Sequence, residues 1–406
     1  MSARRGGKDQ RSLTIGRDRK IAASPSCEAV FFYGVTVMLA AKNLKEDVPN
    51  FGLRTAGMTI GLLGCGVVGG GVASRLLTME TLLGVPVRLG RVLVRDLHKP
   101  RQPEAVIPLL TTDPQDVIGD RNVHVIVEAI GGVEPARTFV DAALRAGKHV
   151  VTSNKALIAA HGAALSLIAQ QNHAALRYEA SVAGAIPVVR TLGEILCAED
   201  VVEIAGVLNG TSNFVVNAMR EGSTLDDAIR CAQEAGYAEI DPSDDLDGVD
   251  AARKLAVLAP LAFRVRINAD QILRTSLRVL TPKHFADARE LGAAIVPLAL
   301  IRRNGERIEA MVSPVLVAED HEFARLRGPE NVVRVQGTHS GMLSFSGHGA
   351  GRSATASAVL SDLAEIARRR ARWQAQSVAP IDFRETTPRV PGFRRHGELP
   401  VFETGI

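Results

Sequence analysis

A glycine-rich turn between a short apolar strand and a helix constrains the fold of this chain more than any other feature. Residues 58–64 (M-T-I-G-L-L-G) are typical of a buried strand, and Gly64, Gly66 and Gly69 have the spacing G-x-G-x-x-G before a helical stretch over 72–83. The first glycine permits a tight turn, the second lets a pyrophosphate approach the backbone, and the third lets the helix pack on the strand. The helix N-terminus then offers N–H groups to the phosphates. We therefore expect a dinucleotide site at Gly64, Gly66, Val67, Val68 and Gly69.

Further strand and helix segments extend this turn into a doubly wound parallel sheet. Strands are expected at 87–94, 123–129 and 148–152, with a helix over 134–146 between the last two. Alternation of this kind predicts an α/β Rossmann nucleotide-binding domain. Lys155 follows the third strand, at the sheet edge where ligands bind. A surface lysine that opens the next helix would give the same pattern.

The end of the second strand bears on the choice of cofactor. Arg95 and Asp96 stand there, with Lys99 and Arg101 shortly after. An acidic residue at this position takes the ribose 2′-hydroxyl of NAD, whereas an arginine accommodates the 2′-phosphate of NADP. Both types are present, so NAD and NADP both stay open, with the concentration of cations favouring NADP. The same cations would also suit a solvated loop.

The stretch 236–254 (G-Y-A-E-I-D-P-S-D-D-L-D-G-V-D-A-A-R-K) concentrates acidic residues in a turn and the start of a helix. Asp250 and Lys254 are four residues apart, so they share one helical face. An ammonium group held beside carboxylates is suited to donate a proton or to bind substrate. A solvated acidic loop with one salt bridge explains the same spacing.

A second polar turn precedes this stretch. The strand expected over 201–208 ends in N-G-T-S-N, where Ser212 or Asn213 is expected to cap the next helix beside a ligand crevice.

Beyond residue 189 the chain combines predicted helices with strand-like segments, which after residue 262 follow one another with polar breaks, and this predicts a second, α+β domain. Strands are expected at 292–302, 306–317, 331–336 and 341–346. Alternation in the second of these predicts antiparallel strands, exposed on one face or paired with a second subunit. A glycine turn at 347–351 then feeds a helix over 354–372 that returns to the nucleotide domain. The domains expected are an extension at 1–57, a dinucleotide-binding domain at 58–188 rejoined by 349–376, a catalytic and dimerisation domain at 189–348, and a tail at 377–406.

Composition excludes several classes of function. The chain has 406 residues, a net charge of +4 and 4% aromatic residues, so neither a basic face nor a stacking platform for nucleic acid is indicated. Its four cysteines lack metal-ligand spacing, which favours free thiols in a reducing compartment. An apolar run over 29–41 follows a basic head; it matches a signal-peptide core in length but is too short to span a bilayer. We expect residues 1–57 to be disordered or to precede the native start at Met58, and we expect no membrane partner.

Five strings together resemble the homoserine dehydrogenase family, over residues 58 to about 376. They are the glycine motif at 64–71, N-K-A-L at 154–157, N-G-T-S-N-F at 209–214, the stretch 236–254, and G-A-G followed by T-A-S-A within 349–358. The stretch 236–254 is the most specific, because it fixes many positions.

This resemblance implies a reversible, NAD(P)H-dependent reduction of L-aspartate 4-semialdehyde to L-homoserine by a cytoplasmic homodimer, in threonine, methionine and isoleucine biosynthesis. Lys254 would protonate the carbonyl oxygen, and Lys155 would lie where nicotinamide and substrate meet. The other implied residues are Glu239, Asp245 and Asp250 for the substrate, Arg95, Gly236, Gly349 and Gly351 for the cofactor, and the backbone of Glu179, Val182, Gly184 and Ile186 for a sodium ion.

Two departures from the family and two alternatives stand beside this interpretation. The tail at 377–406 is too short for an ACT regulatory domain, so feedback by threonine through such a domain is not expected. The extension at 1–57 has no counterpart in the family pattern. Another amino-acid-linked Rossmann reductase would share the glycine motif but not the stretch 236–254. A catalytically silent NAD(P)-binding regulator would share the fold but would be expected to lose Lys254 or the acids.

Overall fold

The computed structural model describes residues 30–32, 35–37, 57–372, 384–397 and 399–402. Contacts divide the chain into residues 1–54 and 55–406. In the first unit, β1 (Val30–Phe32) and β2 (Val35–Val37) form an antiparallel hairpin. The remaining predictions for residues 1–57 fall outside the described part, apart from Gly57. Everything below concerns the second unit.

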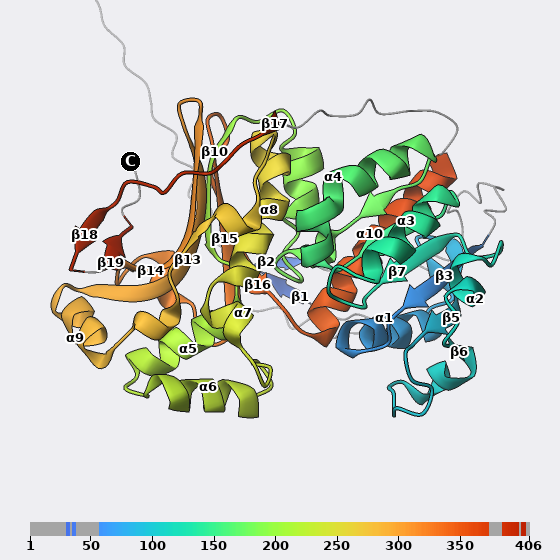
Figure 1. The fold of residues 1–406 in the computed structure, drawn as a ribbon, viewed down its shortest axis with the longest axis horizontal. Helices are drawn as coiled ribbons and strands as arrows, with labels where there is room; N and C mark the ends of the chain where they lie inside the picture. Colours follow the sequence, from blue (N-terminus) through green and yellow to red (C-terminus); the bar gives the residue numbers. More distant parts are fainter. Residues whose placement is uncertain (1–29, 33–34, 38–56, 373–383, 398, 403–406) are drawn as a thin grey trace, which may run out of the picture. The chain divides into compact units, whose positions relative to one another are not determined.

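The first sheet of this unit is parallel along its main path (Figure 1). Its order is β5-β3-β7-β8-β9, so the strand of the glycine motif lies in the middle. A short antiparallel β4 and a short parallel β6 flank β5. The strands are β3 (Met58–Leu63), β4 (Thr81–Leu82), β5 (Val85–Leu93), β6 (Leu110–Thr111), β7 (Val125–Glu128), β8 (His149–Thr152) and β9 (Leu176–Arg177).

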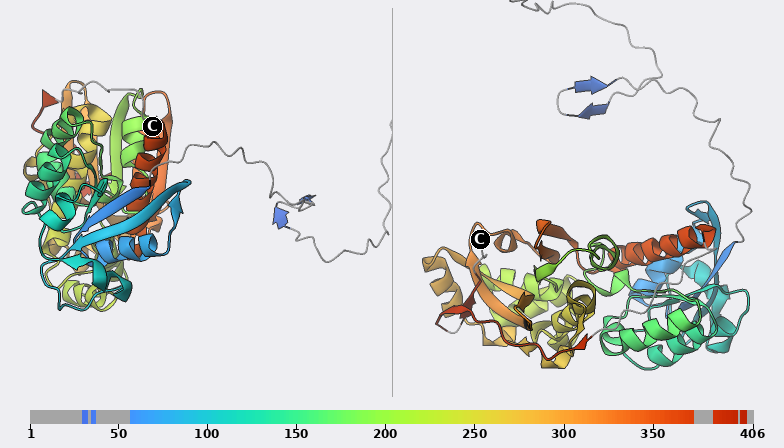
Figure 2. Two further views of the ribbon diagram at one scale, coloured as in Figure 1. Left: turned by 90° about the vertical axis from the view of Figure 1, so that its right-hand side faces the viewer. Right: turned by 90° about the horizontal axis from the view of Figure 1, so that it is seen from above.

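Both faces of the central strands are covered, which is why β3 and β7 are buried along their whole length, whereas β5 alternates between buried and exposed residues near its start. Side chains alternate between the faces of a strand, and β7 shows the result: Val125 and Val127 join one core, while Ile126 joins another. The first core also holds α1 (Val67–Leu77) and α10 (Arg352–Arg372), and the second holds α3 (Ala136–Arg145) and α4 (Lys155–Gln171). The late helix α10 lies along the early helix α1 in Figures 1 and 2. The doubly wound sheet expected from the sequence is therefore confirmed.

The second sheet is mostly antiparallel and carries eight strands. Its order is β16-β15-β10-β13-β14-β19-β18, with β12 paired to β14. One face packs on α8 (Val249–Phe263) together with α5 to α7 and α9, and the other face is covered by residues 322–325 and the C-terminal segment. The strands are β10 (Val201–Val207), β12 (Leu273–Arg274), β13 (Ala293–Asn304), β14 (Arg307–Ala318), β15 (Glu330–Gly337), β16 (Gly341–His348), β18 (Arg394–His396) and β19 (Leu399–Val401).

Several shorter helices lie between the strands; α2 belongs to the first sheet and the others belong to the second. They are α2 (Gln115–Ile118), α5 (Gly210–Arg220), α6 (Leu225–Glu234), α7 (Ser243–Leu246) and α9 (Pro282–Glu290). In the described part of the chain, no helix is long and apolar enough to cross a membrane.

The observed elements correct the expected bounds of one helix and the expected exposure of one strand. The helix after the glycine motif begins at Val67 rather than Val72 and ends at Leu77. Strand β14 does not leave one face exposed, because residues 308–317 are all buried between the two cores of the second sheet.

Part of the segment predicted as a tail belongs to the second sheet. Strand β19 pairs in parallel with β14, and β18 pairs with β19. Phe402 is 5% exposed and stacks on Phe323 with ring centroids 6.0 Å apart. The sequence pattern missed these strands because they are short and gain their order from tertiary contacts with β14.

Candidate active site

Two lysines from different helices converge on one buried carboxylate. Asp250 in the first turn of α8 forms ion pairs with Lys254 (Nζ–Oδ2 2.6 Å) and with Lys155 of α4 (Nζ–Oδ1 2.8 Å). Lys254 also donates to the backbone carbonyl of Leu208 at 2.6 Å. The Lys254 side chain is 9% exposed and that of Lys155 is 37% exposed. The i,i+4 pair foreseen in the sequence is thus a buried three-membered cluster, and not a solvated salt bridge.

Asn209 joins this cluster to the acidic turn. Its Nδ2 donates to Asp250 Oδ2 (2.8 Å) and to Asp245 Oδ1 (2.6 Å). Its Oδ1 accepts from the backbone N–H of Ser212 at 2.7 Å, so Asn209 is also the N-cap of α5. This corrects the prediction of Ser212 or Asn213 as the cap; Ser212 Oγ instead donates to the carbonyl of Asp245.

The electrostatics of the cluster follow from burial and from these pairs. Burial alone would raise the pKa of the Asp250 carboxyl, but the ammonium groups of Lys254 and Lys155 outweigh it and hold this pKa well below its ordinary value. The Asp250 carboxylate in turn raises the pKa of Lys155 despite its burial. Burial, followed by the negative charge of Asp250, raises the pKa of Asp245. Lys155 is therefore held as an ammonium, while Asp245 gains a proton more readily than an ordinary aspartate.

Lys155 is placed by a buried polar chain at the carboxyl ends of β7 and β8. Thr152 Oγ1 donates to Glu128 Oε2 at 2.5 Å, and the Asn154 N–H donates to Thr152 Oγ1 at 3.0 Å. Asn154 Oδ1 then caps α4 by accepting from the Leu157 N–H at 3.1 Å. Since Lys155 is the first residue of α4, this chain fixes where its side chain starts. Its position at a strand end is as predicted.

Glu239 is not brought into this cluster. Its side chain is exposed in the loop between α6 and α7, and its backbone carbonyl accepts from Gln233 Nε2 at 3.1 Å. Gly236 has φ +74° at the end of α6, where its N–H donates to the Gln233 carbonyl. This conformation favours glycine whatever the residue contacts, so it does not by itself point to a cofactor.

The glycine motif has the geometry of a dinucleotide site. Gly64 has φ +93°, and a Cβ on Gly69 would clash with the Gly64 carbonyl oxygen. A Cβ on Gly66, in contrast, would meet nothing within 4 Å, and Val67 is 68% exposed. No side chain caps α1 among the described residues, and its first turn holds no acidic residue, so its N-terminus suits an anion. These residues fit the pyrophosphate of NAD(P).

The cations near the end of β5 divide into two kinds. Arg101 donates to the carbonyl of Asp96 (2.5 Å) and to the carbonyl of Cys65 (3.4 Å). It therefore links the loop after β5 to the glycine motif. Arg95 and Lys99 are exposed. Asp96 Oδ1 accepts from the backbone N–H of His98 at 2.8 Å, which turns this carboxylate toward its own loop.

The loop 179–186 offers backbone rather than side-chain oxygens. The Glu179 carboxylate accepts from the N–H groups of Val189 (2.9 Å) and Arg190 (2.8 Å) and is thereby occupied. Gly184 has φ +52°, and a Cβ there would lie 2.6 Å from the Gly349 carbonyl oxygen. Within the described ranges, no group of three or more His, Cys, Asp or Glu side chains suits a metal ion. The carbonyls expected at Glu179, Val182, Gly184 and Ile186 fit a hard monovalent cation by donor type alone.

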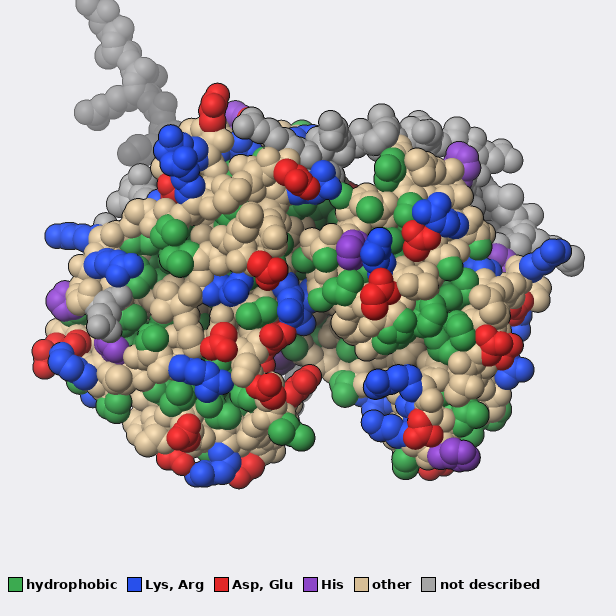
Figure 3. Space-filling view, viewed as in Figure 1, with side chains coloured by type: hydrophobic (Ala, Val, Ile, Leu, Met, Phe, Trp, Pro, Cys, Tyr) green, Lys and Arg blue, Asp and Glu red, His purple; other side chains and the backbone are tan. Residues whose placement is uncertain are grey.

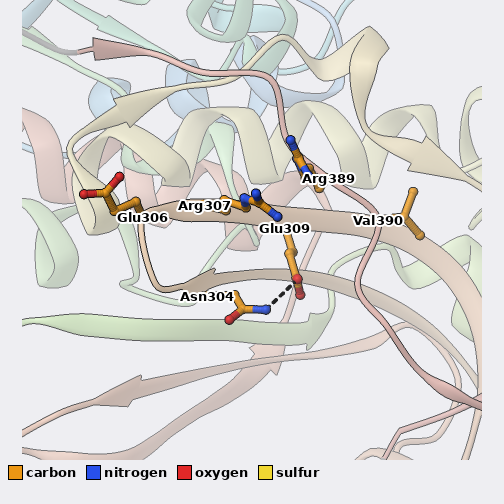
Figure 4. A pocket seen from close by; sticks show the side chains of 6 residues that line it. All are labelled: Asn304, Glu306, Arg307, Glu309, Arg389 and Val390. Atoms are coloured by element: carbon orange, nitrogen blue, oxygen red, sulfur yellow. Dashed lines mark hydrogen bonds between the residues drawn. The ribbon is translucent and has the colours of Figure 1, made fainter.

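A surface pocket lies at a different place from the lysine cluster. Figure 4 shows it between the β13–β14 turn and the C-terminal segment, lined by Asn304, Glu306, Arg307, Glu309, Arg389 and Val390. None of the predicted site residues lines this pocket. Figure 3 shows a separate hollow in the surface between the region of α5 to α7 and that of α1 and β6.

The glycine motif after β3 is a dinucleotide-binding turn, and Lys155, Asp250 and Lys254 on α4 and α8 form a buried lysine–carboxylate cluster. Together these two features define an NAD(P)-dependent oxidoreductase. Two family models match this chain: "Homoserine dehydrogenase, NAD binding domain" over residues 64–179, and "Homoserine dehydrogenase" over residues 187–364. The chain belongs to the homoserine dehydrogenase family, and its activity is that of a homoserine dehydrogenase. The alternatives of another reductase or a silent regulator are therefore not retained.

Individual relatives show the same family over most of the chain. The homoserine dehydrogenase of Bacillus subtilis is 38% identical over 312 residues, which is 76% of this chain and 72% of the relative. That of Synechocystis is 40% identical over 314 residues, with the same coverage of 76% and 72%. The crystal structure of a homoserine dehydrogenase from Thiobacillus denitrificans has a TM-score of 0.76 at 38% identity, covering 82% of this chain and 79% of its own. A hyperthermophilic archaeal homoserine dehydrogenase in complex with NADPH shares the fold, at 23% identity and a TM-score of 0.65.

Proposed function

We propose that the cluster of Lys254, Asp250 and Lys155 is the proton-transfer and substrate-binding centre of the homoserine dehydrogenase reaction. The observation that carries this proposal is one carboxylate, 5% exposed, held within 2.8 Å of two ammonium groups. When bound, the nicotinamide cofactor supplies the hydride chemistry. The chain must then stabilise the charge that develops on the carbonyl oxygen of L-aspartate 4-semialdehyde and protonate that oxygen.

Lys254 is the proposed proton donor to this oxygen, and Lys155 lies beside it at the junction with the cofactor. Asp250 orients both ammonium groups through its two oxygens, so neither side chain has to be ordered when substrate binds. One observation favours an exchange of these roles: Lys155 is 37% exposed and Lys254 only 9%. Lys155 is thus the more accessible of the two to an entering substrate.

The substrate ammonium group is proposed to bind the acids of the same turn. Asp245 and Asp250 already share the Asn209 amide, which fixes their separation. Glu239 completes the set when the exposed loop that carries it closes over the substrate. This loop closure is the part of the proposal that needs movement, since the Glu239 side chain is exposed in the structure.

The preferred cofactor is proposed to be NADP. Supporting this preference, Arg101 is fixed between the Asp96 and Cys65 carbonyls, and the Asp96 carboxylate, the usual partner of an unphosphorylated ribose, is occupied by its own loop. Arg95 is proposed to contact the 2′-phosphate, and Gly236, Gly349 and Gly351 to line the cofactor site. We further propose a sodium ion on the 179–186 carbonyls, a homodimer through the second sheet, and action in the cytoplasm.

The test is the change in absorbance at 340 nm with homoserine, run in parallel with NAD and NADP. The wild type should reduce both, with a higher kcat/KM for NADP. Replacement of Lys254 by Met should lower kcat by roughly two to four orders of magnitude, the usual contribution of a general acid. A Lys155→Met variant run alongside assigns the two roles, because the proton donor loses kcat whereas a substrate contact mainly raises KM.

Lys283 provides a matched control. It forms an i,i+4 pair with Asp287 at 2.6 Å, as Lys254 does with Asp250, but its side chain is 79% exposed. Lys283→Met should keep wild-type turnover. Near-normal kcat in Lys254→Met would remove that residue from the mechanism.

A further inference from the structure

Asn331 is a buried amide that makes no hydrogen bond to the part of the chain that the structure describes. Its exposure is 0%, and neither its Nδ2 nor its Oδ1 has a partner among the residues that the structure describes. The other described residues with such a buried atom are arginines, and each of these makes a contact through another nitrogen. Asn331 therefore differs from them, because its whole polar group is unpaired. Native proteins rarely leave a buried amide in this state.

This amide lies against the glycine loop that precedes α10. Asn331 stands near the start of β15 and pairs with Gly347 in β16, two residues before Gly349. A Cβ on Gly349 would clash with all three outer atoms of the Asn331 side chain, so the amide fills the space that a side chain at 349 would need. The loop holding Gly349 is the one that the proposed function assigns to the cofactor.

The same region is tied to both halves of the proposed site. On one side, the His348 carbonyl accepts from the Ala185 N–H at 3.1 Å, which joins the glycine loop to the 179–186 loop. On the other side, Asn213 Nδ2 donates to the carbonyls of Gly328 (3.0 Å) and Glu330 (3.3 Å). Asn213 belongs to α5, the helix whose N-cap holds the two acids. The start of β15, which carries Asn331, thus contacts both the cofactor loop and helix α5.

We propose that Asn331 is a positioning residue for the cofactor loop, and that its amide forms hydrogen bonds to the peptide groups of Gly349–Gly351 when NAD(P) is bound. The amide has one acceptor oxygen and two donor hydrogens, which suits peptide groups as partners because these offer both a donor and an acceptor. In the free enzyme these bonds are not made, so the buried amide destabilises that state. Cofactor binding orders the loop and provides the missing partners. The inference rests on the proposed function only in taking this loop to contact the cofactor.

The two roles that a buried amide can have give opposite results on substitution. A structural amide is already bonded in the free protein, so its removal lowers stability and leaves the cofactor affinity of the folded protein unchanged. A positioning amide of the proposed kind is unbonded in the free protein. Its removal should leave the thermal midpoint of the free enzyme unchanged or higher, and should weaken cofactor binding.

The experiment measures the thermal midpoint without ligand and the Kd for NADPH and NADH by fluorescence titration, for Asn331→Ala and Asn331→Leu. The first removes the amide, and the second also fills the space it leaves. We expect Kd to rise about tenfold for the better cofactor, which corresponds to about 1.4 kcal/mol, with no loss of midpoint in Asn331→Leu. Asn213→Ala is the matched control: its amide is 2% exposed but bonded in the free enzyme. It should lose stability and keep cofactor affinity.

Unchanged Kd values in the Asn331 variants would overturn the proposal. So would a loss of midpoint in both variants as large as that of Asn213→Ala, because the amide would then be bonded in the free enzyme. The proposed function fails separately, if the wild type binds NADPH but does not oxidise homoserine.

Discussion

Replacing Asp250 by Asn removes the one negative charge that two lysines share. The Asp250 and Lys254 side chains are 7% and 9% exposed, so the pair is buried. Loss of one partner from such a pair costs roughly 3–5 kcal/mol, mainly because the other charge is left buried and unpaired. Two features lower this cost: asparagine keeps one acceptor oxygen, and Lys155 is 37% exposed and stays hydrated. We therefore expect a loss of about 3 kcal/mol in the free energy of unfolding.

Urea denaturation of the ligand-free protein measures this loss, and a double-mutant cycle assigns it to the pair. Asp250→Asn, Lys254→Met and the double variant should show a coupling of about 2 kcal/mol, because removal of both partners leaves no unpaired charge at that position. Asp244→Asn is the control in the same acidic turn. Asp244 is 63% exposed and pairs with Arg253, so its loss should change stability by no more than about 0.5 kcal/mol.

The pH dependence gives an independent check. The pKa of Asp250 is lowered from 3.8, so its contribution to stability is complete above the unfolded-state pKa and is lost as pH falls through the folded-state pKa. The difference between wild type and Asp250→Asn should thus be constant near neutral pH and shrink in acid. A variant as stable as the wild type, or additive effects in the cycle, would refute the buried-pair reasoning.

Three further predictions test other parts of the structure. Gly69→Ala should fail to form the nucleotide turn, because its Cβ would clash with the Gly64 carbonyl, whereas Gly66→Ala should fold normally and raise the Kd for NADPH; circular dichroism and cofactor titration separate the two, and equal folding would contradict the geometry. Asn209→Ala removes the N-cap of α5 and should lower the free energy of unfolding by about 1–2 kcal/mol. It should also raise the KM for homoserine; an unchanged KM would show that the Asn209 amide does not position the acids that bind substrate. Burial would raise the pKa of Glu309, but hydrogen bonds from Asn304 and Arg302 hold it below 4.5. Glu309→Gln should therefore lower the free energy of unfolding by roughly 1–3 kcal/mol at neutral pH, and this difference should shrink as pH falls below about 4.5. A difference that does not change with pH would refute the ionic role of Glu309.

The sequence predicted those parts of the site that depend on local spacing. Asp250 and Lys254 are four residues apart, so helical periodicity placed them on one face, whereas Lys155 was placed by its position after a parallel strand. The amide of Asn209 was missed as a partner because 36 and 41 residues separate it from Asp245 and Asp250. The cap of α5 was misplaced for a related reason: four of the five residues in N-G-T-S-N are suitable caps, and the end of β10 decides between them.

The second sheet was predicted less completely than the first. Strands β13 to β16 were recognised by their alternation and breaks, but the burial of both faces of β14 depends on what packs against them. Strands β18 and β19 have three residues each, too few for a periodic signal. Strand β19 forms because it pairs with β14, which lies more than eighty residues earlier in the chain, and β18 in turn pairs with β19.

The position of α10 has a consequence for synthesis of the protein. Val359, Leu363 and Ile366 of this helix complete a core whose residues outside α10 lie between Met58 and Ala180. A nascent chain emerges from the ribosome N-terminus first. The parallel sheet must therefore wait, with one apolar surface incompletely covered, until the antiparallel strands up to β16 have been translated. A truncation before residue 352 would leave that apolar surface uncovered in the finished protein.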